Sequence, residues 1–302
     1  MKLNYQLPPR AVKHWDEWIG AHQLGDVAVA AEEAGFDMVS MTDHPFPWEP
    51  WLKGGGHHAF DPFVSLAFMA AATKRIKLCT LVVIAGYRHP YIHAKAAASL
   101  DNLSGGRLVM GMGAGYLKQE FDVIGASFED RGKRFDAAVR AIQAAWTGEV
   151  LDYDDEYFPA HGHVMLPRPA QRPGPPIWFG GNSLAAQRRV VALGQGWLPF
   201  EQGEEQAKVT RTPALTTAAQ LADKIGTLKE RLREAGRTDD ISICFGAHGS
   251  GGYEAHAESI ARRLPDFEQA GLTHVLIDAQ ARTFDDCLRE IELYQPLNKA
   301  SR

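Results

Sequence analysis

The residues best suited to chemistry are Asp43, His44 and Trp48, which lie together in the segment Asp43-His44-Pro45-Phe46-Pro47-Trp48. An imidazole exchanges protons near neutral pH, and a neighbouring carboxylate can bind a donor or orient the ring. A tryptophan side chain can stack against a flat ring system. Two interpretations follow from the residues alone: Asp43 and His44 take part in proton transfer, or they only cap a loop.

Two glycine-rich turns offer backbone N–H groups. Gly180-Gly181-Asn182-Ser183 lies between an expected strand and an expected helix, the arrangement in which a helix N-terminus binds phosphate. An ordinary Asn or Ser helix cap is the alternative. The second run, Gly111-x-Gly113-x-Gly115, does not complete a dinucleotide-binding G-x-G-x-x-G pattern, because Tyr116 occupies the last glycine position. Its glycines would let the backbone approach a flat ring or chain closely.

The histidines predict no metal site. His57 and His58 lie in a glycine-rich loop, which either folds over the site or is solvated, and His161 and His163 lie far from the expected strand ends. The first expected strand lacks the His-x-His pair that a metal-dependent barrel hydrolase would carry. A serine nucleophile elbow is also excluded, because the pattern G-x-S-x-G has no match.

Alternating strands and helices must position these residues. Apolar β-rich runs alternate with helical runs along the chain, which is typical of an α/β fold with parallel strands. The expected strands cover residues 3–7, 38–41, 76–84, 107–110, 176–179, 196–200, 241–245 and 275–277. Eight such units predict a (β/α)8 TIM barrel with insertions, in which function lies at the carboxyl ends of the strands. That position favours catalysis by the Asp43-His44 pair.

The whole chain, residues 1–302, is predicted to form one domain, with an inserted excursion at about 151–175. A doubly wound sheet with a second domain is the alternative, but no linker divides the sequence. A net charge of −5 argues against a general nucleic-acid or membrane-surface binder. No apolar run approaches the ~18–20 residues of a membrane span, and no signal peptide is visible. Three scattered cysteines suit a reducing, cytoplasmic location.

Taken together, these segments resemble the luciferase-like monooxygenase superfamily, and within it the F420-dependent oxidoreductases. The resemblance is carried by residues 89–108, by Gly111-x-Gly113-x-Gly115-Tyr116 with the residues up to Arg131, and by Pro175 to Ser183 with Gly196-Trp197-Leu198-Pro199. It implies a (β/α)8 barrel with a flavin or deazaflavin in the mouth at the carboxyl ends of its strands. Homodimers are frequent in this superfamily, so a homodimer is expected by analogy.

The resemblance also implies roles for single residues. Asp43 would contact the cofactor, His44 would exchange the substrate proton, and Trp48 would flank the reacting ring. A non-prolyl cis peptide bond would back that ring at Thr80-Leu81. The other implied cofactor contacts are Val83, Gly113 and Gln119, together with a phosphate-binding turn that comprises Gly180, Gly181, Asn182, Ser183 and Leu184.

One catalytic position departs from the sugar-phosphate dehydrogenases of this family. Tyr116 stands where those enzymes have a glutamate. A tyrosine can donate a hydrogen bond, but with an ordinary pKa near ~10 it is a poor base. This departure argues against sugar-phosphate oxidation but not against hydride transfer in general.

The expected function is therefore hydride transfer between C5 of coenzyme F420 and a small organic substrate. The alternatives are an FMN-dependent monooxygenase and a non-catalytic protein that binds a flavin or deazaflavin. F420 carries a phosphodiester and an oligoglutamate chain, so its site must gather positive charge at one rim. The turn at residues 180–183 would receive the phosphate. Candidates to meet the glutamates are Arg88, Lys118, Arg168 and Arg172.

Overall fold

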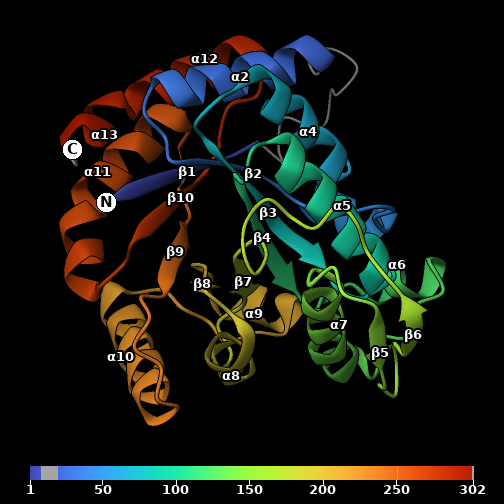
Figure 1. Cartoon of the computed structure of the whole chain (residues 1–302). Coiled ribbons are helices and arrows are strands. Elements are labelled where there is room, and N and C mark those ends of the chain that lie inside the picture. The colour runs from blue at the N-terminus through green and yellow to red at the C-terminus, as the bar shows by residue number, and fades with distance from the viewer. Residues whose placement is uncertain (8–19, 250, 301–302) are drawn as a thin grey trace.

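Eight parallel strands of the computed structural model close into a barrel in the order β1-β10-β9-β8-β7-β4-β3-β2 (Figure 1). The structure describes residues 1–7, 20–249 and 251–300. The barrel strands are β1 (Lys2–Gln6), β2 (Met38–Met41), β3 (Lys77–Ile84), β4 (Leu108–Gly113), β7 (Ile177–Gly180), β8 (Gly196–Leu198), β9 (Ser242–Ala247) and β10 (His274–Asp278). The predicted (β/α)8 TIM barrel is confirmed.

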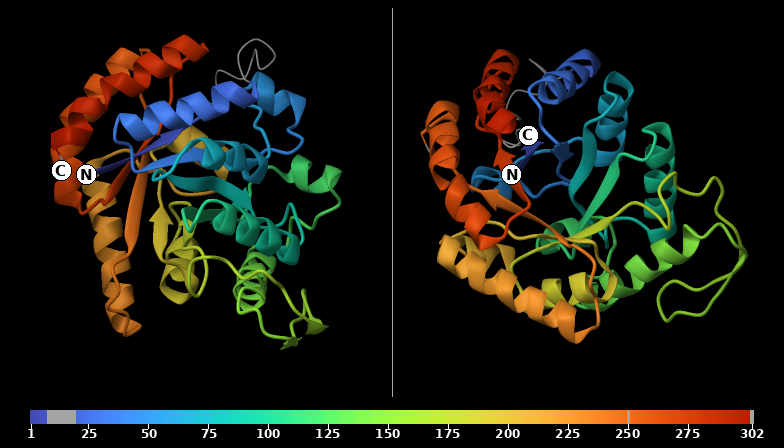
Figure 2. Two further views of the ribbon diagram at one scale, coloured as in Figure 1. Left: turned by 45° about the horizontal axis from the view of Figure 1, so that its top comes forward. Right: turned by 60° about the vertical axis from the view of Figure 1, so that its left-hand side comes forward.

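Helices surround the strands in a ring, as the right-hand view of Figure 2 shows. The long helices are α2 (Ala21–Glu33), α4 (Pro62–Ala72), α5 (Pro90–Leu103), α7 (Arg131–Ala145), α8 (Leu184–Leu193), α10 (Ala218–Glu234), α11 (Tyr253–Ala270) and α12 (Phe284–Leu293). Shorter helices are α3 (Glu49–Lys53), α6 (Lys118–Val123), α9 (Glu204–Thr210) and α13 (Gln295–Ala300). No helix in the described ranges is both long and apolar enough to span a membrane.

Local sequence explains where these elements begin. The Asp61 carboxylate accepts hydrogen bonds from the backbone N–H groups of Phe63 and Val64, and Pro62 occupies the first position of α4. The barrel strands are apolar on both faces, because one face meets the barrel interior and the other meets the helices. Because both faces are buried, the strands can be recognised in the sequence as short apolar runs.

Two segments differ from the sequence expectation. β4 continues to Gly113 instead of ending at Met110, and the glycine at position 111 is required there: a Cβ atom would lie 2.1 Å from the carbonyl oxygen of Thr80. The excursion at 151–175 contains a two-stranded antiparallel sheet of β5 (Leu151–Tyr153) and β6 (Ala160–His163). It packs outside the barrel, where the Tyr91 hydroxyl donates to the Phe158 carbonyl at 2.7 Å.

Candidate active site

A hydrogen-bonded cluster lies beyond the carboxyl ends of β2, β3 and β4. Nδ1 of His44, which follows β2, is 3.0 Å from Oε2 of Glu120 on α6. The Tyr87 hydroxyl, from the loop after β3, donates to the same oxygen at 2.7 Å. The Glu120 side chain is fully buried, and its Oε1 has no hydrogen-bond partner among the residues that the structure describes. Segments far apart in the sequence thus converge on one buried carboxyl group.

Aromatic side chains enclose the imidazole of His44. The Trp51 ring lies 4.6 Å from it at an interplanar angle of 34°, and the His57 ring lies 4.8 Å from it, nearly perpendicular. Nε2 of His57 is 3.3 Å from the Thr42 hydroxyl, so the glycine-rich loop is folded over the site. Only 11% of the His44 side chain is exposed. The indole that contacts His44 is therefore Trp51, whereas Trp48 is 47% exposed.

Asp43 joins the ends of β2 and β3. Its carboxylate accepts two hydrogen bonds from Arg88, at 2.7 and 3.0 Å, and one from the backbone N–H of Ile84, at 3.1 Å. Asp43 is 3% exposed, and Arg88 also donates to Asp61 at 2.7 Å. Arg88 is thus neutralised by two carboxylates. These contacts argue against its expected role of binding the glutamates of a cofactor.

Tyr116 lies close to the same cluster. Burial raises its pKa to about 12, with a further contribution from the Glu120 carboxylate, while a hydrogen bond from Trp51 acts in the opposite direction. The phenol therefore keeps its proton at neutral pH and is available as a hydrogen-bond donor. Gln119, the implied cofactor contact on α6, is exposed.

The cis peptide bond of β3 lies between Leu81 and Val82, which corrects the expected position, Thr80-Leu81, by one residue. Register with β4 shifts between Thr80 and Val83, and this bulge displaces the residues in between. Thr80 is buried and its hydroxyl donates to the Gly111 carbonyl at 2.8 Å. Val83 is also fully buried, in the core.

The side chain of Val82 faces one glycine of β4, the neighbouring strand, and one glycine of β7, the strand beyond it. A Cβ built at Gly113 would lie 2.8 Å from Val82 Cγ2, and one built at Gly180 would lie 3.3 Å from Val82 Cγ1. Both glycines therefore permit close packing over the bulge of β3, at the end of the barrel that carries His44. Among the expected contacts, Gly113 and Gly180 fit this arrangement, and Val82 is a residue that the sequence analysis missed.

The turn after β7 is well bonded within the protein. Gly181, with φ of +112°, donates its N–H to the Leu198 carbonyl, and the Asn182 N–H donates to the Thr212 hydroxyl. The Asn182 side chain is 1% exposed and bonds to the backbone of neighbouring loops. Ser183 caps α8 by accepting from Ala186 N–H at 3.2 Å. Ser183 thus caps α8, whereas the Asn182 side chain ties the turn to the segments at Phe200 and Pro213, and Leu184 is 53% exposed at the start of α8.

Two arginines beside this turn share one aromatic ring. The guanidinium carbons of Arg131 and Arg211 lie 3.9 and 4.8 Å from the centroid of Phe128. Arg131 also donates to the Gly115 carbonyl at 3.1 Å, and Arg211 directly precedes Thr212, which binds Asn182. Within the described ranges, neither guanidinium has a carboxylate at ion-pairing distance. Burial and the proximity of Arg211 lower the pKa of Arg131.

We call Arg131 and Arg211, which share the ring of Phe128, the arginine pair. It lies between the turn after β4 and the turn after β7, and it supplies positive charge that, among the described residues, is not engaged in an ion pair, although Glu129 lies near enough to Arg131 to act in favour of its charged form. Sequence reasoning missed it: Arg131 was visible only as part of the family resemblance, and Arg211 lies in a polar segment that gave no signal. Arg211 has a left-handed backbone, with φ of +55°, which a non-glycine residue adopts rarely and often at functional sites.

The remaining basic candidates lie elsewhere. Lys118 is exposed and paired with Asp122. Arg168 donates to the Thr147 carbonyl, and Arg172 donates to the carbonyl of Gln171. The Gln171 side chain binds the carbonyl of Leu108, the first residue of β4, so this part of the excursion lies at the amino ends of the strands. The expectation that Arg168 and Arg172 reach the mouth is therefore wrong, because the excursion runs toward the opposite end of the barrel.

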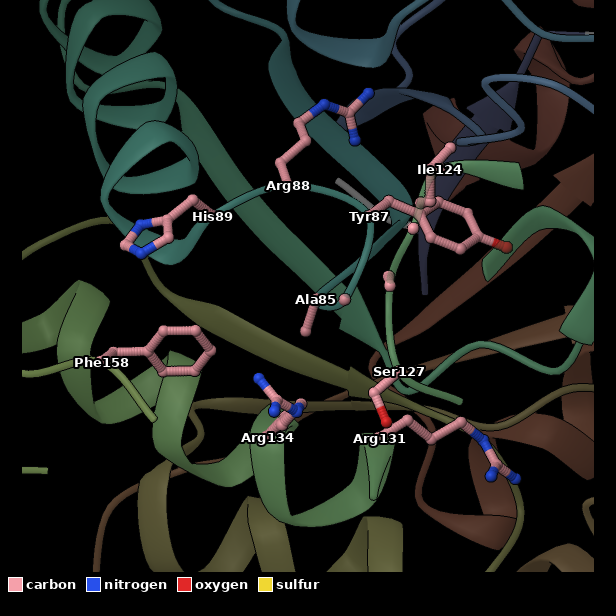
Figure 3. Close-up of a pocket in the computed structure, with 12 residues that line it drawn as sticks. Ala85, Tyr87, Arg88, His89, Ile124, Ser127, Arg131, Arg134 and Phe158 are labelled. Atoms are coloured by element: carbon pink, nitrogen blue, oxygen red, sulfur yellow. The ribbon is translucent and has the colours of Figure 1, made fainter. Parts of the chain in front are cut away.

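A pocket of about 360 Å³ opens beside the cluster (Figure 3). Its walls are the loop after β3, with Tyr87 and Arg88, and the first turns of α7, with Arg131 and Arg134. Phe158 of the excursion closes one side. Among the described residues, no group of three or more His, Cys, Asp or Glu side chains is arranged to hold a metal ion.

Comparison with known sequences gives a consistent set of relatives. The profile of a family described as luciferase-like monooxygenase matches residues 6–250. An F420-dependent glucose-6-phosphate dehydrogenase of Gordonia bronchialis is 31% identical over 217 residues, which cover 69% of this chain and 62% of the relative. The enzyme of the same name from Nakamurella multipartita is 34% identical over 224 residues, covering 71% and 64%. The chain thus spans less than two thirds of these relatives.

Solved structures share the fold. The monooxygenase RslO1 from Streptomyces bottropensis superposes with a TM-score of 0.76 at 24% identity and covers 98% of both chains. An F420-dependent secondary alcohol dehydrogenase, solved with an F420-acetone adduct, superposes with a TM-score of 0.78 at 17% identity, covering 100% of this chain and 99% of the other. At these identities the likeness shows a shared fold.

Proposed function

This chain belongs to the luciferase-like monooxygenase family, and from that premise we propose that it is an F420-dependent oxidoreductase acting on a small organic substrate. The observation that carries the proposal is the clustering of His44, Glu120 and Tyr87 beyond the carboxyl ends of the barrel strands. Relatives that are named F420-dependent dehydrogenases support the choice of cofactor.

The residues present fit such a cofactor in two respects. Gly113 and Gly180 carry no side chain where Val82 packs against them, so the bulge of β3, which the resemblance places behind a flat ring, can lie close to β4 and β7. The arginine pair beside the turn after β7, which has no ion pair among the described residues, offers positive charge for a phosphodiester and for carboxylates. When bound, F420 would supply a two-electron carrier that exchanges a hydride at C5.

The protein's own part in the reaction is to move and to hold protons. Nδ1 of His44 is occupied by Glu120, so Nε2 is the ring nitrogen left for the substrate. In the oxidising direction the substrate carbon loses a hydride and its hydroxyl proton passes to Nε2; in the reducing direction the same proton returns. Tyr116, protonated at neutral pH, would donate a hydrogen bond near the substrate oxygen.

Titration of the purified protein with F420 and, separately, with FMN tests the proposal. We expect a lower dissociation constant for F420, and the absorbance of F420 should change during turnover in a screen of alcohols, aldehydes and enones. Tighter binding of FMN, with oxygen-dependent turnover, would replace the proposal with the FMN-dependent monooxygenase. Tight binding of F420 without turnover of any substrate would favour the cofactor-binding protein. The homodimer and the cytoplasmic location stay predictions.

Arg211→Ala should weaken binding of complete F420 by about tenfold, or ~1.4 kcal/mol, because one unneutralised guanidinium is removed from the anionic end of the site. The loss should shrink at high salt, which screens charge. Binding of the phosphate-free deazaflavin core should not change. Arg188→Ala, which alters an exposed arginine on α8, is the matched control. Equal losses for the core and for complete F420 would contradict an anion-binding role.

A further inference from the structure

The buried carboxyl group of Glu120 is the centre of the next inference, which rests on the proposed function. Glu120 lies in α6, none of its side-chain surface is exposed, and its Oε2 meets both His44 Nδ1 and the Tyr87 hydroxyl. Burying a charged carboxylate is costly unless donors compensate for the lost water. The Tyr87 hydroxyl is one such donor, and a proton on Nδ1 of His44 would provide a second.

We propose that Glu120 is the positioning residue of this site, which holds His44 as the Nδ1-protonated tautomer and directs the basic Nε2 lone pair toward the substrate. An ionised carboxylate only accepts hydrogen bonds, so the contact at 3.0 Å requires a proton on Nδ1. A neutral imidazole carries one N–H, and its proton is then fixed on the nitrogen that faces away from the reaction.

Tyr87 supports this assignment. Burial raises its pKa well above the ordinary value, and the Glu120 carboxylate raises it further. The phenol therefore stays protonated and donates to Oε2 at 2.7 Å. Tyr87 therefore donates a hydrogen bond to the Glu120 carboxylate. Because the phenol keeps its own proton, Tyr87 does not take the proton of His44.

The packing around His44 keeps the ring in one orientation. Trp51 lies 4.6 Å from the imidazole on one side, and His57 contacts it edge-on at 4.8 Å. A half-turn of the ring about its Cβ–Cγ bond would put Cδ2 in the place of Nδ1 and break the contact with Glu120. His44 is thus fixed twice, by packing and by the hydrogen bond to Glu120.

This arrangement also stabilises the charged state of the catalytic cycle. When Nε2 receives the substrate proton, His44 becomes an imidazolium beside a carboxylate that is shielded from water. The attraction between opposite charges is stronger in such a dry environment than in solvent. A buried carboxylate that orients a histidine and stabilises its cation is a general catalytic device.

The tautomer can be measured without cofactor or substrate. In protein carrying 15N-labelled histidine, the long-range 1H–15N spectrum should show His44 protonated at Nδ1, with His44→Gln identifying its signals. In Glu120→Gln, the side-chain amide can face Nδ1 as a donor, and the Nε2-protonated form should gain population. A wild-type His44 protonated at Nε2 would overturn the proposal, whether or not any variant folds.

Kinetics supply the second measurement. Glu120→Gln should lower kcat by ~10²-fold or more, because the wrong tautomer leaves no lone pair toward the substrate. The dissociation constant of F420 should stay within about twofold of the wild type. Glu120→Asp, which retains the charge on a shorter side chain, should recover part of the lost turnover.

Two controls separate positioning from a structural effect. Tyr87→Phe removes the other donor and leaves the carboxylate on His44, so it should lower kcat less than tenfold. Glu149→Gln changes an exposed glutamate and should leave turnover unchanged. Full turnover in a folded Glu120→Gln would reduce Glu120 to a packing residue. Failure of F420 to bind would instead refute the proposed function, and the tautomer measured without cofactor would still decide the role of Glu120.

Discussion

Replacing His44 with alanine is expected to lower turnover by ~10²–10⁴-fold, the usual contribution of a general acid–base group. The imidazole is the proton-transferring group of the cluster, and its Nε2 faces away from Glu120. The dissociation constant of F420 should change by less than about twofold, because the side chain acts on the substrate proton. Stopped-flow absorbance of F420 and equilibrium titration measure the two quantities separately.

The neighbouring His58 provides the control for this experiment. It lies in the same loop as His57, is exposed, and should tolerate alanine with normal turnover. A His44→Ala enzyme that turns over at the wild-type rate would show that His44 belongs to the loop structure only. A large loss of F420 affinity in the same variant would instead assign His44 to cofactor binding.

Asp43→Ala is expected to lower the free energy of unfolding by about 3 kcal/mol, the usual range for breaking a buried ion pair. The change leaves Arg88 with Asp61 as its remaining carboxylate and removes the acceptor of the Ile84 N–H. Both groups are partly or wholly buried, so water does not replace the lost contacts fully. Urea unfolding followed by circular dichroism measures the change.

The matched control is Asp122→Ala, which removes one partner of the exposed pair with Lys118 and should cost less than ~1 kcal/mol. The family resemblance assigns Asp43 to the cofactor instead. An Asp43→Ala protein that unfolds at the wild-type urea concentration but no longer binds F420 would favour that role. If the variant is less stable but still binds F420 at low temperature, Asp43 has the structural role that its contacts with Arg88 and Ile84 indicate.

The barrel could be predicted because its strands are buried on both faces and stand out as short apolar runs. β2 and β3 were located from such runs to within a residue. The end of β4 was missed, because Gly111 and Gly113 lower strand propensity, and the reason for a glycine there is a contact with Thr80 on another strand. Short helices such as α9 gave no apolar pattern and were also missed.

The candidate site could be predicted only in part, because its chemistry depends on contacts across the barrel. His44 is visible in a local motif, but its partner Glu120 is 76 residues away, and nothing in the sequence shows that this carboxyl group is buried. Trp48 and Trp51 are equivalent candidates until the turn of α3 brings one of them onto His44. Whether the basic loop residues reach the mouth of the barrel depends on the path of the excursion, and this path takes Arg168 away from the mouth.

The closure of the barrel by β1 has a consequence for synthesis of the chain. β1 pairs with β2 on one side and with β10 on the other, and Tyr5 of β1 donates to Glu290 of α12. A ribosome makes β1 and β2 long before it makes β10 and α12. Until then the nascent chain exposes two strand edges that can pair with other chains. Closure of the barrel must therefore wait until β10 has been made, and chaperones that shield open strand edges should help this chain to fold.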